Sequence, residues 1–283
     1  MKLLPDFPEL PDLQIVSCSA LQPHERVDEQ RAVPLVERME EEAILRNPPV
    51  VIPAGDRAER FVVLDGANRT VAMRLMGLPH ALVQVVHAGG TTVQLRTWNH
   101  VVTEIATPRL VEVIEGFPEI ALIPSDEERA TFNLSAGGTL AYLVLPGGKV
   151  LEVVGETAPL EWSVRNLNRL VESYQSISRV ERINSAQTRG LERLYPGFAG
   201  MIVFRPFEIE EVVAAAATGL LLPAGLTRFV ISPRALRVDY PLELLAKDEP
   251  LEMKRQALGE WLRQRIRGRH VRFYAESTFL FDE

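Results

Sequence analysis

Residues 60–77 read RFVVLDGANRTVAMRLMG, two hydrophobic stretches separated by a short polar turn. The β-branched pair Val62 and Val63 predicts a strand over Arg60–Leu64. Hydrophobic residues continue at helical spacing over Val71–Met76, and the glycine that follows is a typical helix C-terminal cap. With a further strand expected over Leu82–Val86, residues 60–86 are predicted to form a compact strand–turn–helix–strand unit.

The turn Asp65-Gly66-Ala67-Asn68-Arg69-Thr70, which we call the glycine turn, is a candidate phosphate-binding site, because it leads from the strand into the first turn of the helix. The first amides of a helix lack internal partners and lie at the positive end of its dipole, so they can bind a phosphate group. Arg69 adds a planar phosphate donor, while Asn68 and Thr70 add short polar side chains. Asp65 is placed to hold a magnesium ion. The alternative is a capped turn with a surface ion pair.

The composition indicates a folded protein. The chain has 283 residues, 46% of them hydrophobic, which suits one large domain or two ordinary ones. A net charge of −7 argues against non-specific nucleic-acid binding, which depends on basic residues. The single cysteine, Cys18, cannot build a disulfide framework or a cysteine-based zinc site and is expected to be packed. Without a signal peptide or a long apolar stretch, we expect a cytoplasmic protein with no membrane contact.

The remaining pattern predicts a mixture of helices and strands. The fold class expected is α+β, with a change of character near Pro108 that suggests domains 1–106 and 107–283. Expected strands are Gln14–Ser17, Val50–Ile52, Arg228–Ile231, Val271–Ala275 and a hairpin of Leu140–Leu145 with Val150–Val154. Expected helices are Asp28–Glu42, whose start could lie near Pro34, and Ser163–Tyr174, Ile209–Ala217 and Leu251–Ile266.

Two short polar segments lie outside the glycine turn. Pro23 precedes the pair His24-Glu25, in which the carboxylate could act as a general base and the imidazole could orient it; the alternative is a solvated loop. The segment Trp98-Asn99-His100 could form a pocket wall with polar side chains; the alternative is a core tryptophan at a domain junction.

Arginines dominate two further segments. Arg228 and Arg234, with Ser232 between them, could close over anionic groups, although arginines on a strand are usually solvated. Basic residues then recur between Arg263 and Arg272, after a helix whose C-terminus attracts cations. We interpret this second run as a solvated helix end in preference to a nucleic-acid patch.

Taken in order, these segments resemble the free L-serine kinases of the ParB/sulfiredoxin-like superfamily, a group that includes the serine kinase associated with siderophore biosynthesis. The glycine turn alone is moderately specific, and the His-Glu pair ahead of it with the C-terminal arginines points to the kinase branch. The matching pieces reach both ends of the chain: residues 23–25, 45–50 and 63–70, Trp98, the run Arg228–Leu242, and the segment Arg272–Ser277.

The resemblance implies a fold and a reaction. The fold would be an N-terminal ParB/sulfiredoxin-like nucleotide-binding domain and a C-terminal α+β domain, with the active site in the cleft between them. The reaction would be phosphoryl transfer from ATP or ADP, with Mg²⁺, to free L-serine, giving O-phospho-L-serine. Such transfer depends mainly on positioning and charge stabilisation.

The resemblance also implies roles for individual residues. Glu25 would take the hydroxyl proton, His24 would flank the transferred phosphate, and Asp65 would hold magnesium or position the acceptor. Nucleotide binding is implied for Asn47, Pro48, Val50, Asp65, Gly66, Ala67, Asn68, Arg69 and Thr70. Substrate binding is implied for Trp98, Asn99, His100, Arg228, Ser232 and Arg234.

One residue departs from the family pattern. The family usually has histidine immediately before the arginine of the glycine turn, and here that residue is Asn68, which can donate to a phosphate oxygen but cannot be charged. Two alternatives therefore remain: a ParB-like nucleotide-binding transcriptional or partition regulator, and a ligand-sensing protein that keeps the fold without the activity. A sulfiredoxin reaction is disfavoured because Ala67 stands where that chemistry needs a thiol.

Overall fold

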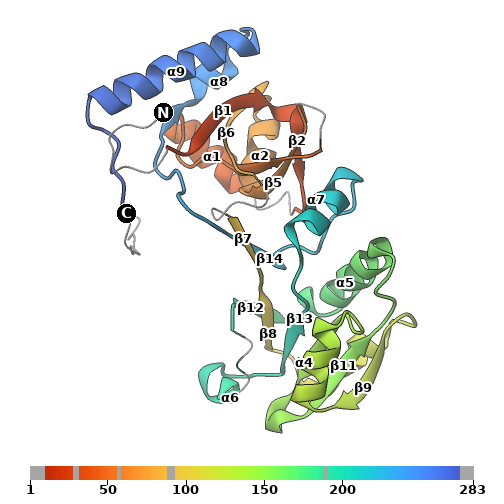
Figure 1. The fold of residues 1–283 in the computed structure, drawn as a ribbon. Coiled ribbons are helices and arrows are strands. Elements are labelled where there is room, and N and C mark those ends of the chain that lie inside the picture. Colours follow the sequence, from red (N-terminus) through yellow and green to blue (C-terminus); the bar gives the residue numbers. More distant parts are fainter. Residues whose placement is uncertain are drawn as a thin grey trace.

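The computed structural model describes residues 10–27, 32–55, 59–87, 93–185, 187 and 190–274. The first half of the chain builds a five-stranded sheet in the order β1-β6-β4-β5-β2 (Figure 1). Neighbouring strands are antiparallel in the pairs β1/β6 and β4/β5 and parallel in the pairs β4/β6 and β2/β5. Its strands are β1 (Asp12–Ser17), β2 (Leu21–Pro23), β4 (Val50–Pro53), β5 (Phe61–Asp65) and β6 (His80–Val85).

Both faces of this sheet are covered, because its central strands have hydrophobic side chains on each side. Val51 and Val63 belong to one hydrophobic cluster, while Val62 and Leu64 belong to another. The first cluster also receives side chains from α1 (Val33–Glu42) and α2 (Ala67–Leu75), and the second receives side chains from α7 (Ile209–Ala217). The covering elements therefore come from both halves of the chain.

The C-terminal segment returns to the first sheet. Strand β15 (Tyr240–Pro241) pairs with β3 (Ile44–Leu45), and the helices α8 (Leu242–Ala246) and α9 (Leu251–Arg267) follow. Helix α9 lies beside β1 (Figure 1). Tyr240 and Leu258 pack in the same cluster as Met73 of α2, so the two ends of the chain share one core.

The middle of the chain forms a second sheet of six strands in the order β12-β8-β13-β10-β11-β9, and every neighbouring pair is antiparallel. Helices α3 and α5 supply one of its cores, and α4 and α6 supply the other. The strands are β8 (Asn99–Thr103), β9 (Ala121–Ser125), β10 (Ala141–Val144), β11 (Val150–Val154), β12 (Arg179–Ile183) and β13 (Gly200–Phe204). The helices are α3 (Thr107–Glu115), α4 (Glu127–Ser135), α5 (Leu160–Gln175) and α6 (Leu191–Leu194).

A two-stranded ribbon joins the two sheets. It consists of β7 (Val93–Thr97) and β14 (Thr227–Ile231), which pair antiparallel and lie between the sheets in Figure 1. Strand β7 runs almost directly into β8 of the second sheet. Helix α7, which precedes β14 in the chain, contacts β2 and β5 of the first sheet. The ribbon therefore brings residues 227–231 to the edge of the N-terminal half.

The α+β class and most of the expected elements are confirmed. Helix α7 has the predicted bounds, α1 begins at Val33 with a proline in its first turn, and the predicted hairpin is formed by β10 and β11. Residues 28–31 of the predicted first helix lie outside the described residues. Strand β4 separates β5 from β6, so residues 60–86 do not form a unit of adjacent strands.

The predicted strand Val271–Ala275 is wrong for the four residues that the structure describes. Val271–Tyr274 have no regular structure and are exposed, and they pair with no strand that the structure describes. Ala275 lies outside the described residues. The division of the chain between residues 106 and 107 stays a prediction, to which the structure adds that α8 and α9 pack on the first sheet.

Candidate functional site

The glycine turn is built as the sequence predicts, but its arginine folds back over it. Gly66 lies at φ +90°, a left-handed conformation that favours glycine, and it precedes the first residue of α2. Arg69 donates to Oδ2 of Asp65 at 2.8 Å, to the carbonyl of Pro48 at 3.3 Å and to the carbonyl of Asn47. A Cβ on Gly66 would lie 2.9 Å from Nη2 of Arg69, so the guanidinium group packs directly against the turn.

A second arginine reaches the same carboxylate from the C-terminal half. Arg234 donates to Oδ2 of Asp65, and its Nε is buried without a hydrogen-bond partner in the described part of the chain. The buried side chain of Gln84 holds this segment, since it donates to the carbonyl of Pro233 at 2.9 Å and accepts from the amide of Ala235 at 2.9 Å. We call Asp65, Arg69 and Arg234 the Asp65 cluster.

The other predicted nucleotide-binding residues differ in what they expose. Asn68 is exposed at the start of α2, whereas Val50 is fully buried in the sheet. Thr70 is buried, and its hydroxyl donates to the carbonyl of Gly66 at 3.2 Å, which supports the turn from within the helix. The side chain of Asn47 accepts from the amide of Arg237 at 2.8 Å and so connects the C-terminal segment to the N-terminal half of the chain.

The pair His24-Glu25 is held in the protein interior and does not form a solvated loop. The Glu25 carboxylate accepts hydrogen bonds from the amides of Gly225, Leu226 and Thr227 at 2.6, 3.1 and 2.7 Å. It also accepts from the Thr227 hydroxyl at 2.5 Å. Three successive amides aimed at one carboxylate form an anion-binding nest. We call residues Gly225–Thr227 the Glu25 turn.

These contacts keep Glu25 ionised. Burial raises the pKa of Glu25, but His24, whose Nε2 lies 3.7 Å from Oε1, and the hydrogen bonds from Thr227 lower it more, so the pKa falls below its ordinary value. The His24 ring itself lies between the carbonyl of Val63 at 2.5 Å and the hydroxyl of Thr227 at 2.6 Å. Glu25 is therefore a fixed anion at neutral pH.

The His24-Glu25 pair and the Asp65 cluster lie close together. Strand β2 runs parallel to β5 with Pro23 opposite Val63, so the residues after β2 emerge beside the end of β5. His24 forms a hydrogen bond to the carbonyl of Val63, which lies two residues before Asp65 in the chain, and this contact holds His24 beside the end of β5. The structure thus brings together a carboxylate, an imidazole and two arginines that the sequence places in separate segments.

The residues of the segment Trp98–His100 have different surroundings: Trp98 fits the predicted pocket wall, whereas Asn99 and His100 do not. Trp98 is half-buried, and the guanidinium carbon of Arg228 lies 4.7 Å from the centre of its ring, with Nη1 of Arg228 buried and without a hydrogen-bond partner among the described residues. A buried guanidinium nitrogen without a partner is a candidate anion donor. Ser232 is exposed one residue beyond β14.

Asn99 and His100 are buried and use their polar atoms inside the protein. His100 contacts the Tyr174 hydroxyl at 2.7 Å, and burial lowers its pKa to about 4, so the ring is neutral. Asn99 donates to the carbonyl of Ser185 at 3.1 Å and accepts from the amide of Phe204 at 3.2 Å. These contacts place Asn99 and His100 in the core, so the pocket-wall prediction does not hold for these two residues, and the proposed site does not include them.

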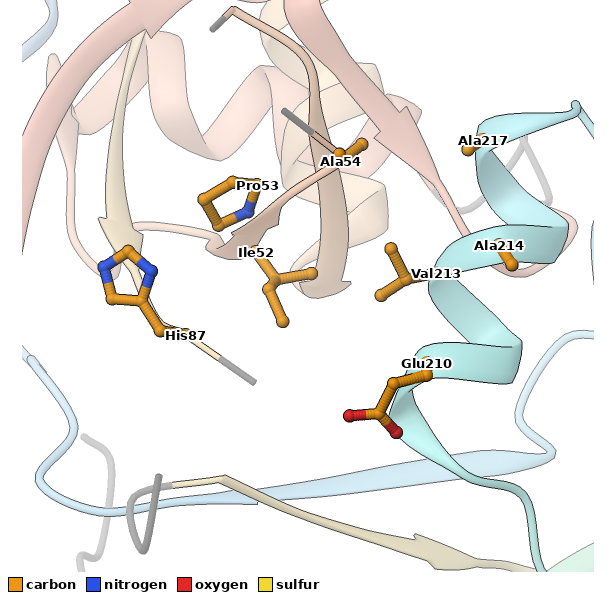
Figure 2. A pocket seen from close by; sticks show the side chains of 9 residues that line it. Ile52, Pro53, Ala54, His87, Glu210, Val213, Ala214 and Ala217 are labelled. Atoms are coloured by element: carbon orange, nitrogen blue, oxygen red, sulfur yellow. The ribbon is translucent and has the colours of Figure 1, made fainter. Parts of the chain in front are cut away.

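A pocket lies elsewhere, between the end of β4 and helix α7 (Figure 2). Its volume is about 530 Å³, and its lining is mostly apolar with His87 and Glu210 at its margin. None of the residues predicted to bind nucleotide or substrate lines it.

Within the described part of the chain, no helix has the length and apolar character needed to cross a membrane.

No protein-family model matches the chain. It is 24% identical over 275 residues to the ATP-dependent L-serine kinase SbnI of Staphylococcus aureus, covering 96% of this chain and 97% of that protein. The structure of SbnI with a C-terminal truncation matches with a TM-score of 0.72 at 22% identity, over 90% of this chain and 97% of that one.

The fold also matches a free serine kinase variant, with glutamate replaced by glutamine, in complex with AMP. The TM-score is 0.72 at 15% identity, over 85% of this chain and 97% of that one. The resemblance predicted from the sequence is therefore confirmed, and the fold extends over nearly the whole length of these proteins.

Proposed function

We propose that this protein is a small-molecule kinase that transfers a phosphoryl group from ATP or ADP to the hydroxyl of free L-serine, giving O-phospho-L-serine. The observation that supports this most is the fixed Glu25 anion beside the Asp65 cluster. An anionic carboxylate can accept a hydroxyl proton, and two arginines can bind phosphate oxygens. The similarity to the ATP-dependent kinase SbnI favours ATP as the donor.

In this proposal the Asp65 cluster binds the nucleotide phosphates. Its two guanidinium groups share one carboxylate, which leaves a net positive charge at the N-terminus of α2. Burial lowers the pKa of Arg69 while the charge of Asp65 opposes that effect, which favours a charged guanidinium. Incoming phosphate oxygens compete with Asp65 for Arg69 and Arg234, and the exposed Asn68 adds a neutral donor.

Asp65 fits a magnesium ion only as part of a shared site. Among the described residues, no group of three or more histidine, cysteine or acidic side chains could hold a metal. Magnesium commonly uses one or two carboxylates and completes its coordination with phosphate oxygens and water. Asp65 would be the protein ligand in such a site, and the bound ion would neutralise charge on the phosphates.

The acceptor serine lies, in our proposal, between Glu25 and the Arg228–Trp98 pair. The buried Nη1 of Arg228 is suited to the serine carboxylate, and the Trp98 ring holds the guanidinium plane in place. Arg228 directly follows the Glu25 turn in the chain, so the residues that hold the Glu25 carboxylate adjoin Arg228 at the start of β14. A cytoplasmic location stays a prediction.

Phosphorus NMR tests the proposal directly. Purified protein is incubated with L-serine and magnesium, with ATP in one reaction and ADP in another, and the expected product is a phosphomonoester resonance that coincides with added O-phospho-L-serine. A parallel reaction without magnesium tests the metal requirement. If neither donor yields phosphoserine, the kinase proposal is wrong, and a gel-shift measurement with DNA then tests the regulator alternative.

A further inference from the structure

Thr227 connects the two polar residues of the His-Glu pair. Its hydroxyl oxygen lies 2.6 Å from Nε2 of His24 and 2.5 Å from Oε1 of Glu25, and the residue is 9% exposed. His24 and Glu25 do not form a direct hydrogen bond, because Nε2 and Oε1 are 3.7 Å apart. The hydrogen-bonded connection between the imidazole and the carboxylate therefore passes through the Thr227 hydroxyl, which belongs to the other half of the chain.

The hydrogen positions in this network follow from what each atom can do. The Val63 carbonyl can only accept, so Nδ1 of His24 carries a proton. The Glu25 carboxylate also only accepts, so the single hydroxyl proton of Thr227 is donated to Oε1. The hydroxyl oxygen is then the acceptor for Nε2 of His24. All three contacts are satisfied together when His24 donates from Nδ1 to the Val63 carbonyl and from Nε2 to the Thr227 hydroxyl, while that hydroxyl donates to an ionised Glu25.

The two carboxylate oxygens of Glu25 are consequently not equivalent. Oε1 accepts from the amides of Leu226 and Thr227 and from the Thr227 hydroxyl. Oε2 accepts from Gly225 and from no other group that the structure describes. A carboxylate oxygen accommodates about two hydrogen bonds, so the capacity that remains for a substrate hydroxyl is on Oε2.

We propose that Thr227 is a positioning residue for the kinase reaction: its hydroxyl couples His24 to Glu25 and occupies Oε1, so that Oε2 is the atom that receives the acceptor's proton. This inference rests on the proposed function. In the step, the serine hydroxyl proton moves to Oε2 while a bond forms between the serine oxygen and the transferred phosphorus. The bond from that phosphorus to the bridging oxygen breaks, and the nucleotide leaves with its electron pair.

Other charged and titratable groups near Glu25 lie behind the Glu25 turn. Nε2 of His100 is 3.4 Å from the carbonyl of Gly225, and Arg182 donates to the carbonyl of Ala224 at 3.4 Å. His100 is neutral above about pH 4, because burial lowers its pKa to that value. Arg182 carries a constant charge. A change in the titration of Glu25 on altering Thr227 is therefore not explained by either of these groups.

The test compares Thr227→Val, which removes the hydroxyl while keeping the shape, with Thr227→Ser, which restores it. Thr97→Val is the matched control, since Thr97 lies directly opposite Thr227 in the ribbon and its hydroxyl donates only to the carbonyl of Arg205, at 3.2 Å, in the described structure. Kinase kcat and KM are measured across mildly acidic to mildly basic pH, after thermal unfolding has established that each variant is folded.

For Thr227→Val we expect kcat to fall by about 10- to 100-fold with little change in the KM for nucleotide. The acidic limb of the pH profile should move to higher pH, because removing a hydrogen bond to the carboxylate raises the pKa of Glu25. Thr227→Ser should recover most of the rate, and Thr97→Val should resemble the wild type. An unmoved acidic limb in Thr227→Val, or no recovery in Thr227→Ser, would overturn the proposal.

A measurement that needs no turnover separates this inference from the proposed function. Nitrogen-edited NMR of His24 should show protons on both ring nitrogens in the wild type and loss of the protected Nε2 proton in Thr227→Val. If the wild type makes no phosphoserine, the kinase proposal fails on its own. If the wild-type spectrum shows only one ring proton on His24, the coupling through Thr227 is wrong whatever the activity.

Discussion

Arg234 forms an ion pair with Asp65, although the two residues are 169 positions apart in the chain. The pair joins the C-terminal segment to the end of β5, where Arg69 already binds the same carboxylate oxygen at 2.8 Å. Two guanidinium groups around one carboxylate leave an excess positive charge at the start of a helix. Such a site attracts an anion, and the fold assembles it from residues that no local pattern connects.

Replacing Arg234 should weaken nucleotide binding. The change Arg234→Gln removes one charged donor from the Asp65 cluster, and hydrogen bonds to charged groups contribute about 1.5–3 kcal/mol. We expect the dissociation constant for ATP to rise by about 10- to 100-fold in isothermal titration calorimetry. Arg109→Gln is the control, because Arg109 lies in an exposed ion pair on α3. Equal ATP affinity in both variants would remove Arg234 from the phosphate site.

Replacing Glu25 with glutamine should affect stability as well as activity. Glutamine offers one acceptor oxygen and an amide that donates, so it cannot accept at both ends from the Glu25 turn. Turnover should be lost while ATP still binds, and the free energy of unfolding should fall by about 1–3 kcal/mol.

Urea unfolding and phosphorus NMR measure these two effects of Glu25→Gln. The exposed Glu115 on α3, changed to glutamine, provides a control of the same chemistry. Full turnover in Glu25→Gln would exclude Glu25 as the base. Unchanged stability would show that the Glu25 turn does not depend on the carboxylate.

Local periodicity was enough to predict individual elements. Helix Ile209–Ala217 follows from its continuous apolar pattern, and the conformation of Gly66 follows from a turn between a strand and a helix. The ion pair between Arg69 and Asp65 belongs to the alternative interpretation of the turn, in which Arg69 is not primarily a phosphate donor. The sequence did not predict that this arginine packs back over the helix N-terminus, because that depends on the carbonyls of Asn47 and Pro48.

Local sequence patterns do not predict contacts between segments that are far apart in the chain. Glu25 and the Glu25 turn are about 200 residues apart, and nothing near Glu25 indicates three amides aimed at its carboxylate. Gln84 is a polar residue inside the apolar run of β6, which weakly indicates a buried polar contact. Nothing in the sequence indicates that its partners are Pro233 and Ala235. For His100, the sequence is compatible with either a pocket wall or a buried hydrogen-bond network. The contact with Tyr174, which is distant in sequence, shows that the ring lies in a buried network.

Cys18 should be unreactive in the folded protein. Burial raises the pKa of its thiol to about 11, despite the opposing charges of Arg74 and Lys254, and the thiolate is the reactive form. At about pH 8 we expect no reaction with Ellman's reagent in the native state and one thiol per chain in guanidinium chloride, since the chain has one cysteine. Rapid labelling of the native protein would show that the thiol is accessible.

His100 should make the stability depend on pH. Its pKa is about 4 in the folded protein and near its ordinary value of 6.5 when unfolded. Between these values the unfolded chain binds a proton that the folded chain does not, so the free energy of unfolding falls as pH drops through this window. Between about pH 7 and pH 5 the contribution is about 2 kcal/mol, and below the folded pKa it adds no further loss.

The variant His100→Gln isolates this contribution, because glutamine can retain a contact with Tyr174 but cannot titrate. Urea unfolding of wild type and variant at neutral and mildly acidic pH should give a stability difference that narrows by about 2 kcal/mol on acidification. His87→Gln is the control, since His87 is exposed and should leave the wild-type dependence unchanged. A difference between wild type and His100→Gln that stays constant with pH would mean that His100 is not buried as a neutral ring.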